Sequence, residues 1–303
     1  MLWLCLLVSL NGLTAPVDTR QEVMINGIRQ WIQIKGADSS LPILLFLHGG
    51  PGNSAMGYSE KFTGALQRHF LVVIWDQRES GKTAKLNTSP VPLTVDLVVQ
   101  DAFGMINYLR ERFARNKIYL MGHSWGGFLA LYVASRYPEI LEACFALAPM
   151  VHQQQSEQEA WKVMMEEAGN RHDKEALKEL SAVHIPFESG EQLYFHRKWL
   201  AKKMGSSAPG KSMVLNWSLK WLPLFNEGSA INLFVAAPEI NCPVYFFVGT
   251  RDYQTSSKLT EAYFQTVKAE KKDLFWFTNS AHSLNLTEPT KLQDIVISLQ
   301  AKP

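Results

Sequence analysis

The feature that most constrains this chain is a serine flanked by glycines, in the stretch GHSWG at residues 122–126. This G-x-S-x-G pattern places a serine on a sharp turn between a strand and a helix, because only small residues two positions away let the backbone bend so tightly. The flanks agree: residues 117–121 form a short apolar run typical of a strand, and residues 128–134 continue as a buried helix. The pattern predicts a nucleophilic hydroxyl at Ser124.

A serine hydroxyl needs a base, and the base needs an orienting acid. The later chain offers both in the order Ser, Asp, His that accompanies this turn. Asp252 comes just after the strand-like run 243–249, and His282 lies in the loop that follows a second run at 274–277. The alternatives are a loop carboxylate that caps the next helix and a satisfied surface imidazole. We predict a catalytic triad of Ser124, Asp252 and His282.

An oxyanion hole is predicted from the loop HGGPG at residues 48–52, which follows the apolar run 43–47. Glycines expose backbone N–H groups without obstruction by side chains, which suits the stabilisation of a developing negative charge. One donor of such a hole follows the nucleophile and the other comes from an early loop of this kind. We therefore expect the donors to be the amides of Gly50 and Trp125. The alternative is a tight turn that only redirects the chain.

Apolar runs alternate with helical stretches along the chain, a pattern typical of a mostly parallel sheet with helices on both faces. The segment from Glu22 to Lys35 resembles a hairpin that turns at Asn26-Gly27. Residues 94–115 have apolar positions at helical spacing, with Thr94 as a cap. The predicted strands are 43–47, 70–75, 117–121, 144–148, 244–248 and 274–277.

Residues 151–238 differ in composition from the rest of the chain. They are rich in Glu, Lys and Trp and read as helices with apolar seams, inserted before the strand that leads to Asp252. We therefore predict a helical cap at 151–238 on a core made of residues 16–150 and 239–303. A cap at this place would decide which substrates reach Ser124.

Three motifs together resemble the proline iminopeptidase branch of the α/β-hydrolase superfamily. They are HGGPG at 48–52, WDQR at 75–78 followed by Gly81, and SWG at 124–126, and the resemblance spans most of residues 22–300. The resemblance implies an α/β-hydrolase fold and a serine hydrolase that removes an N-terminal proline, or another small residue, from peptides. Relatives with the same motifs act on esters, amides or other acyl groups, so the mechanism transfers more safely than the substrate.

The chain departs from the family pattern at several positions. Glu79 replaces the first glycine after DQR, and His123 stands where the serine turn often has glycine. Family caps supply glutamates that hold the free amine of the substrate; Glu191 and Tyr194 lie in an E-x-x-Y-F segment that resembles one of these, and we expect them to bind substrate. Tyr253 occupies the position where some relatives carry a second glutamate.

The first fifteen residues contain no charged side chain and hold an apolar run of nine residues at 2–10. Such a run is too short to cross a bilayer, which needs about 20 residues. Followed by small residues, it resembles a secretory signal peptide, so we predict a signal at 1–15 and a secreted or periplasmic protein without stable membrane association. An uncleaved anchor or a misplaced start are the alternatives, and a cytoplasmic protein follows if 1–15 is not a signal.

The composition of the chain limits the kinds of ligand and partner that we expect the protein to bind. A formal net charge of +2, from 30 basic and 28 acidic side chains, gives no reason to expect nucleic acid. No phosphate loop, GxGxxG pattern or Cys/His metal cluster occurs, so we expect neither a cofactor nor a metal. Beyond the first residues the cysteines are Cys144 and Cys242. Two buried free thiols are favoured over a disulfide between them.

Two classes of function follow from these motifs. The first is a serine hydrolase that acts on a small molecule or short peptide through an acyl-enzyme, most simply an aminopeptidase, with an esterase or amidase as its main rival. The second is a non-catalytic ligand receptor that kept the hydrolase scaffold. Nothing needed for catalysis is missing from the sequence, which favours the enzyme.

Overall fold

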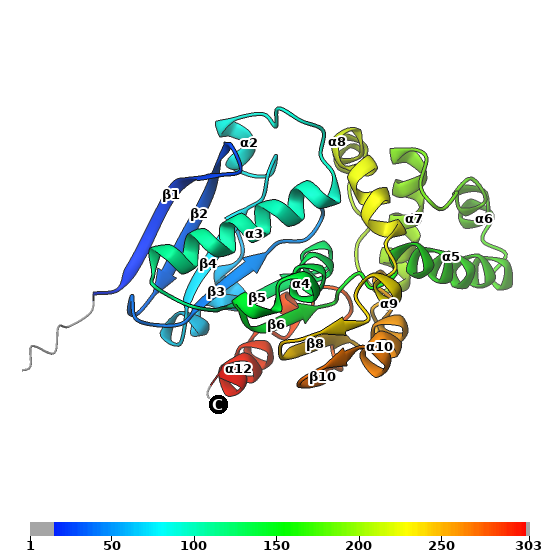
Figure 1. The fold of residues 1–303 in the computed structure, drawn as a ribbon. Helices are drawn as coiled ribbons and strands as arrows, with labels where there is room; N and C mark the ends of the chain where they lie inside the picture. The colour runs from blue at the N-terminus through cyan, green and yellow to red at the C-terminus, as the bar shows by residue number, and fades with distance from the viewer. Residues whose placement is uncertain (1–14, 301–303) are drawn as a thin grey trace, which may run out of the picture.

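The computed structural model describes residues 15–300 and shows one eight-stranded sheet covered by helices on both faces (Figure 1). The strand order is β1-β2-β4-β3-β5-β6-β8-β10. Its strands are β1 (Val17–Ile25), β2 (Ile28–Gly36), β3 (Ile43–Leu47), β4 (Leu71–Asp76), β5 (Ile118–His123), β6 (Leu141–Leu147), β8 (Val244–Gly249) and β10 (Lys272–Phe277). The predicted signal segment falls, except for Ala15, outside the described residues and stays a prediction.

The predicted mostly parallel architecture is confirmed. All neighbours from β4 to β10 pair in parallel, whereas β1 and β2 form the predicted hairpin and β2 pairs antiparallel with β4. A small separate pair is formed by β7 (Glu239–Ile240) and β9 (Lys268–Ala269). Because the central strands run in one direction, the loops at their carboxyl ends meet along one edge of the sheet.

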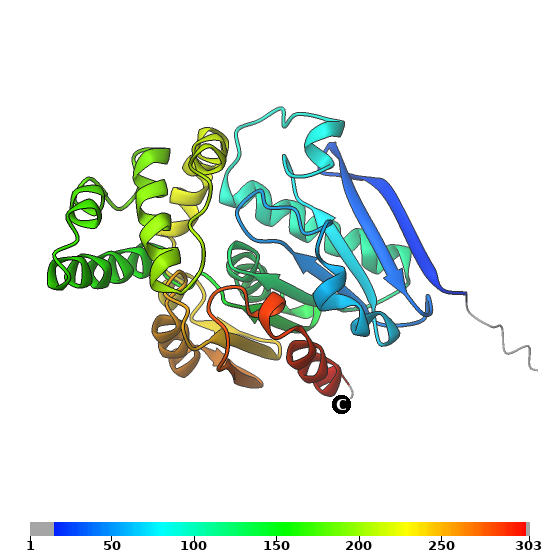
Figure 2. The ribbon, with the colours of Figure 1, turned by 180° about the vertical axis from the view of Figure 1, so that it is seen from behind.

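The long helices of the core are α3 (Val95–Arg112), α4 (Trp125–Arg136), α10 (Ser257–Thr266) and α12 (Pro289–Gln300). Successive strand residues alternate between two apolar cores, as the two-residue period of a strand requires. On β3, Leu45 and Leu47 belong to the core beneath α3, α4 and α10, whereas Leu44 and Phe46 belong to the core beneath α12. In Figure 2, which shows the molecule from behind, α12 is the dark red helix beside the C-terminus.

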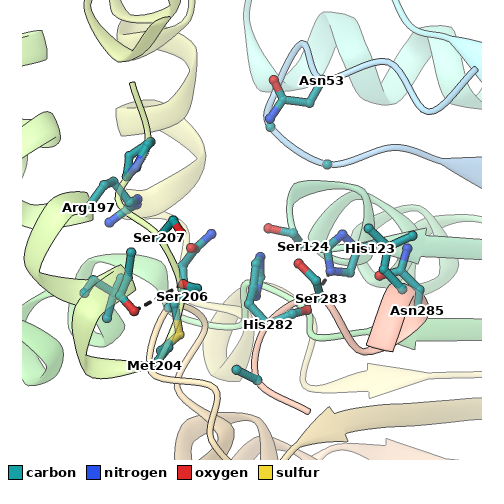
Figure 3. Close-up of a pocket in the computed structure, with 18 of the residues that line it drawn as sticks. Asn53, His123, Ser124, Arg197, Met204, Ser206, Ser207, His282, Ser283 and Asn285 are labelled. Atoms are coloured by element: carbon teal, nitrogen blue, oxygen red, sulfur yellow. Dashed lines mark hydrogen bonds between the residues drawn. The ribbon is translucent and has the colours of Figure 1, made fainter. Parts of the chain in front are cut away.

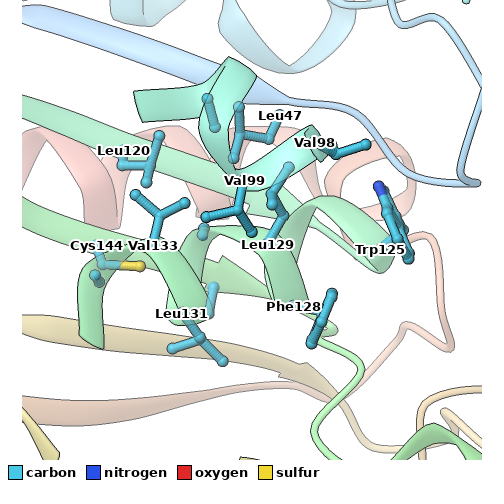
Figure 4. Close-up of a cluster of buried hydrophobic side chains, with 14 of the residues drawn as sticks. Leu47, Val98, Val99, Leu120, Trp125, Phe128, Leu129, Leu131, Val133 and Cys144 are labelled. Carbon is cyan, nitrogen blue, oxygen red and sulfur yellow. The ribbon is translucent and has the colours of Figure 1, made fainter. Parts of the chain in front are cut away.

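Helix α3 matches the predicted helix closely. Thr94 caps it, since its side chain accepts a hydrogen bond from the amide of Leu97 at 3.2 Å. Its apolar stripe packs on α4 and on the sheet, where Val99 and Leu129 meet Leu47 (Figure 4). This contact fixes α4, and with it the position of its first residues.

The longer helices of the predicted cap insertion are α5 (Gln153–Asn170), α6 (Lys174–Ser181), α7 (Gly190–Lys203) and α8 (Lys211–Ala230). Helices α5, α6 and α7 share a small apolar cluster of their own, which includes Met164, Leu180 and Leu200, whereas the buried apolar side chains of α8, such as Leu224, belong to the larger core. Figure 1 shows these four helices together at one side of the sheet. Within residues 15–300, no helix combines the length and apolar character needed to cross a membrane.

The remaining elements are short and lie in connections. They are α1 (Glu60–Thr63), the 3₁₀ helix η1 (Ala65–Arg68), α2 (Thr83–Leu86), the 3₁₀ helix η2 (Pro138–Ile140), α9 (Leu233–Ala236) and α11 (Leu284–Thr287). Cys144 and Cys242 are buried free thiols in the described chain, and burial raises the pKa of Cys242 to about 12. Both side chains therefore serve as small apolar groups.

A buried ion pair joins the DQR segment to α3. The Arg78 guanidinium donates to both carboxylate oxygens of Asp101, with Nε–Oδ2 at 2.6 Å and Nη2–Oδ1 at 2.9 Å. The two side chains are 1% and 0% exposed. Asn26 of the β1–β2 turn donates to the same carboxylate at 3.0 Å. The pair therefore ties three segments of the core together.

Asp101→Ala should lower the free energy of unfolding by about 3–5 kcal/mol, because it leaves the Arg78 charge buried without a partner. Asp96→Ala is the matched control on the same helix. Its carboxylate pairs with Arg136 at 3.2 Å in an exposed position, so its loss should cost about 1 kcal/mol or less. Urea unfolding of both variants checks this, and equal costs would contradict the role given to the buried pair.

Candidate active site

Ser124 forms the turn between β5 and α4 with φ of 59° and ψ of −117°, a conformation that L residues rarely adopt. The flanking glycines are both required. A Cβ on Gly122 would overlap the carbonyl oxygen of Gly126, and a Cβ on Gly126 would overlap that of Leu47. The Ser124 amide donates to the carbonyl of Leu147 at 2.9 Å, which anchors the turn to β6. The turn therefore lifts the serine side chain clear of the sheet.

Asp252 follows β8 and His282 follows β10, so both stand at the same edge of the sheet as Ser124. Nδ1 of His282 lies 2.9 Å from Oδ2 of Asp252. The carboxylate also accepts hydrogen bonds from the Thr255 hydroxyl at 2.8 Å and from the amides of Gln254 and Thr255. Gly249, at the end of β8, lets the histidine loop approach, since a Cβ there would overlap the carbonyl of Ala281.

The environment of Asp252 favours its charged form. Burial alone raises the pKa of this carboxyl group, but the charge on His282 and the hydrogen bonds from His282 and Thr255 outweigh it, so the pKa lies below its ordinary value. An ionised carboxylate keeps the proton on Nδ1 of His282. Nε2 is then the ring nitrogen with a lone pair to accept a proton.

Ser124 and His282 line one cavity of about 870 Å³ between the sheet edge and the cap. Figure 3 shows both side chains facing it, with Asn53 on the side of the HGGPG loop and Arg197, Met204 and Ser207 on the side of the cap. A cavity of this size is typical of a site for a small-molecule or short-peptide ligand.

The predicted oxyanion donors are Gly50 of the HGGPG loop and Trp125, the residue after the serine. Gly50 lines the cavity, and its φ of 118° requires a glycine. Trp125 is the first residue of α4, where free amides and the helix dipole favour negative charge. Within residues 15–300 neither amide donates another hydrogen bond. Both are therefore free to donate to an oxyanion.

The DQR segment supports the HGGPG loop from the core. The amide of Gln77 donates to Nε2 of His48 at 3.2 Å, and its side chain donates to the His48 carbonyl at 3.1 Å. Nδ1 of His48 donates to the Gly49 carbonyl at 2.9 Å. Burial lowers the pKa of His48, which keeps the ring neutral for these contacts. The DQR motif thus holds the HGGPG loop through contacts in the core, and its residues do not line the cavity.

Neither Glu191 nor Tyr194 lies among the residues that line the cavity. Glu191 is 55% exposed and pairs with Lys211 at 2.7 Å, and the same ammonium lies over the Tyr194 ring. The cavity side of α7 consists of Leu193, Arg197, Leu200 and Ala201, and Met204, which follows the helix, continues it. Glu191 precedes Leu193 by two residues and so points to another face of the helix. The binding role expected of Glu191 and Tyr194 has no geometric support.

Two arginines that were not predicted from the sequence line the cavity. Arg197 lines it and donates to both carboxylate oxygens of the buried Glu157, at 2.6 Å and 2.5 Å. On the core side, Arg251, next to Asp252, also lines the cavity and donates to the Asn279 carbonyl at 2.8 Å. Among residues 15–300, no Asp or Glu lines this cavity. The one sequence feature that could have indicated this part of the cavity wall is the four-residue spacing of Leu193 and Arg197, which places them on the same face of a helix.

His123 has a structural role in the site. Its Nε2 donates to the backbone carbonyl of His282 at 2.9 Å, and the two rings lie 4.9 Å apart. Burial, with a smaller contribution from the charge on His282, lowers the pKa of His123 to about 4. His123 is therefore a neutral donor that holds the loop bearing the histidine of the predicted triad.

In the described chain, no three His, Cys, Asp or Glu side chains gather as ligands for a metal ion. At the edge of a parallel sheet, a serine on a strained strand-to-helix turn beside an acid–histidine pair is characteristic of the α/β hydrolases. The chain belongs to this family: the family described as alpha/beta hydrolase fold matches residues 42–272.

Individual relatives agree with this assignment. The probable aminopeptidase YbaC of Bacillus subtilis (strain 168) is 29% identical over 299 residues, which cover 89% of this chain and 92% of the relative. Among solved structures, the proline iminopeptidase of Mycobacterium smegmatis is similar with a TM-score of 0.64 and 17% identity, over 93% of this chain and 97% of the other. A proline iminopeptidase-related protein of Thermus thermophilus gives a TM-score of 0.63 at 23% identity, over 94% and 98%. Both structures show the shared fold.

His123→Phe should slow the reaction of Ser124 with a fluorophosphonate probe by about tenfold, because it keeps the ring but removes the hydrogen bond to the His282 carbonyl. His123→Gln, which retains a donor at similar reach, should keep most of the rate. Labelling rates of the two variants and the wild type check this. Equal labelling of His123→Phe and wild type would show that the contact does not position His282.

Proposed function

We propose that the protein is a serine hydrolase that cleaves ester or amide bonds through an acyl-enzyme, with Ser124, His282 and Asp252 as its triad. The observation that carries this proposal is the 2.9 Å contact between His282 and Asp252 beside a serine held on a strained turn in the same cavity. A nucleophile, a base and an orienting acid in this order are the parts that acyl transfer by a serine needs.

The reaction begins when the Ser124 hydroxyl attacks the substrate carbonyl while Nε2 of His282 takes its proton. The carbonyl oxygen becomes an oxyanion and accepts hydrogen bonds from the amides of Gly50 and Trp125. His282 then protonates the leaving amine or alcohol, which departs and leaves the acyl group on Ser124. Water, deprotonated by His282, attacks this acyl-enzyme; the bond to Ser124 then breaks, His282 returns the proton to the serine oxygen, and the acid is released.

Ser124→Ala should lower turnover by several orders of magnitude and abolish labelling by a fluorophosphonate while the protein stays folded, because only the hydroxyl is lost. Asp252→Asn should also lower turnover strongly, because the histidine loses its orienting charge. Hydrolysis assays with circular dichroism as a folding control check both. Wild-type protein that neither turns over substrate nor reacts with the probe would favour the non-catalytic receptor instead.

The first candidate activity is that of an aminopeptidase on short peptides with an N-terminal proline or other small residue. It is supported by the relative named a probable aminopeptidase, which matches along nearly the whole chain, and by the HGGPG and DQR motifs. An enzyme of this kind must hold the free amine of its substrate at a fixed distance from the nucleophile. Neutral acceptors in the cavity wall, such as the side chains of Gln153 and Asn53, are its available partners here.

The second candidate is an esterase or amidase that does not require a free amine. One observation favours it: within the described chain, the side chains with a formal charge that line the cavity are Arg197 and Arg251, with no carboxylate among them. An ammonium group placed there lacks the charge-assisted hydrogen bond that a carboxylate supplies. An uncharged acyl group meets no such penalty.

A matched pair of substrates separates the two candidates. For an aminopeptidase, prolyl-p-nitroanilide should be hydrolysed at least a hundredfold faster than its N-acetylated form, because acetylation removes the charge and all N–H donors of the recognised amine. p-Nitrophenyl acetate reports the acyl chemistry in both cases. Similar rates on the free and the acetylated anilide would establish the esterase or amidase candidate.

A further inference from the structure

Helix α8 of the cap touches the loop that carries Gly50. The indole N–H of Trp217 donates to the carbonyl of Pro51 at 2.8 Å. One turn later, the indole of Trp221 lies against Gly52 so closely that a Cβ at Gly52 would overlap it. Two successive residues that follow Gly50 are therefore held by neighbouring tryptophans of one helix.

The same helix touches the second proposed oxyanion donor. Gly228 of α8 lies against the indole of Trp125, and a Cβ at Gly228 would overlap that ring. Positions 217, 221 and 228 fall on one face of an α-helix, since steps of four and seven residues return to the same side. This face of α8 thus contacts Trp125 itself and the two residues that follow Gly50.

A third contact reaches the loop that supports His48. Lys220 donates to the backbone carbonyl of Glu79 at 3.0 Å and pairs with its carboxylate at 2.5 Å. Glu79 has φ of 62° and stands where the resembled family has glycine. The next residue, Ser80, has its hydroxyl 2.9 Å from the His48 ring. Helix α8 therefore also contacts the segment that holds the HGGPG loop from the core.

Gly50 lies between two supports of different origin. On its amino-terminal side, His48 is fixed by Gln77 of the core. On its carboxyl-terminal side, Pro51 is fixed by Trp217 of the cap. Removal of the second support leaves the Pro51 carbonyl without the indole donor, while the Gly49 carbonyl keeps its contacts with His48 and Asn53. The loop can then shift after Gly50, and a donor that is moved off the oxyanion loses much of its value.

We propose that α8 is a positioning element of the oxyanion hole and that Trp217 is its positioning residue, a role that rests on the proposed function. In Figures 1 and 2, α8 stands between the core and the other cap helices. The helix also lines the cavity through Met213, Val214, Trp217 and Phe225. A substrate that fills the cap side of the cavity therefore contacts the element that aims the donor at its carbonyl oxygen.

The test compares two Trp→Phe variants of the full chain. Trp217→Phe keeps an aromatic ring in the cavity wall but removes the hydrogen bond to Pro51. Trp161→Phe is the matched control, because its indole N–H donates to a carbonyl inside the cap, that of Leu180, at 2.9 Å. Each variant is assayed for kcat and KM on p-nitrophenyl acetate, for its rate of fluorophosphonate labelling, and for thermal unfolding.

Trp217→Phe should lower kcat about tenfold with KM changed less than twofold and should slow labelling by a similar factor, because both steps place negative charge on an oxygen in the hole. Trp161→Phe should keep the wild-type kcat and labelling rate even if its melting temperature falls. Gly228→Ala, which crowds Trp125 from the same helix, should reproduce the loss in kcat.

Three results would overturn the positioning role. They are a wild-type kcat in Trp217→Phe, a change in KM alone, and an equal loss of kcat in Trp217→Phe and Trp161→Phe, which would indicate a general effect of a weakened cap. Failure of the proposed function gives a different result. In that case the wild-type protein itself shows no Ser124-dependent hydrolysis or labelling.

Discussion

The close approach of backbone to backbone at the serine turn is the constraint on which the rest of the site depends. Helix α4 begins so near the ends of β3 and β5 that neither Gly122 nor Gly126 has room for a Cβ. This proximity forces Ser124 into its strained conformation and sets the first amide of α4 beside it. The packing of α4 beneath α3 and against the sheet supplies the rigidity that the strain requires.

Around this turn, core and cap contribute different things. The core carries the groups proposed for the reaction: the Asp252–His282 pair, the glycine loop and the buried polar contacts of Gln77 that hold it. The cap supplies most of the apolar surface of the cavity and the paired charge of Arg197 and Glu157. Such a division lets one reaction serve different substrates, because the cap can change while the reacting groups stay in place.

Much of the fold followed from the sequence because its signals are local. Buried strands are short apolar runs, and the serine turn has its glycines at fixed spacing. Strand β1 begins at Val17, earlier than the predicted hairpin. The prediction was too short because β1 is an edge strand, and its exposed side chains, such as Asp18 and Arg20, weaken the apolar pattern. The cavity wall was harder to predict. Which face of α7 turns inward depends on packing, and a motif around Glu191 carries no information about that.

The contact between Trp221 and Gly52 bears on how the two parts of this protein can evolve. Gly52 has φ of 87° and no space for a side chain, and the space is taken by a residue of the cap. Glycine is thus required at position 52 both by its own turn and by a contact with a residue about 170 positions away. Core and cap are not freely exchangeable modules. A cap grafted from a relative would need matching indoles on its last long helix. Without them, the space beside Gly52 would be left unfilled.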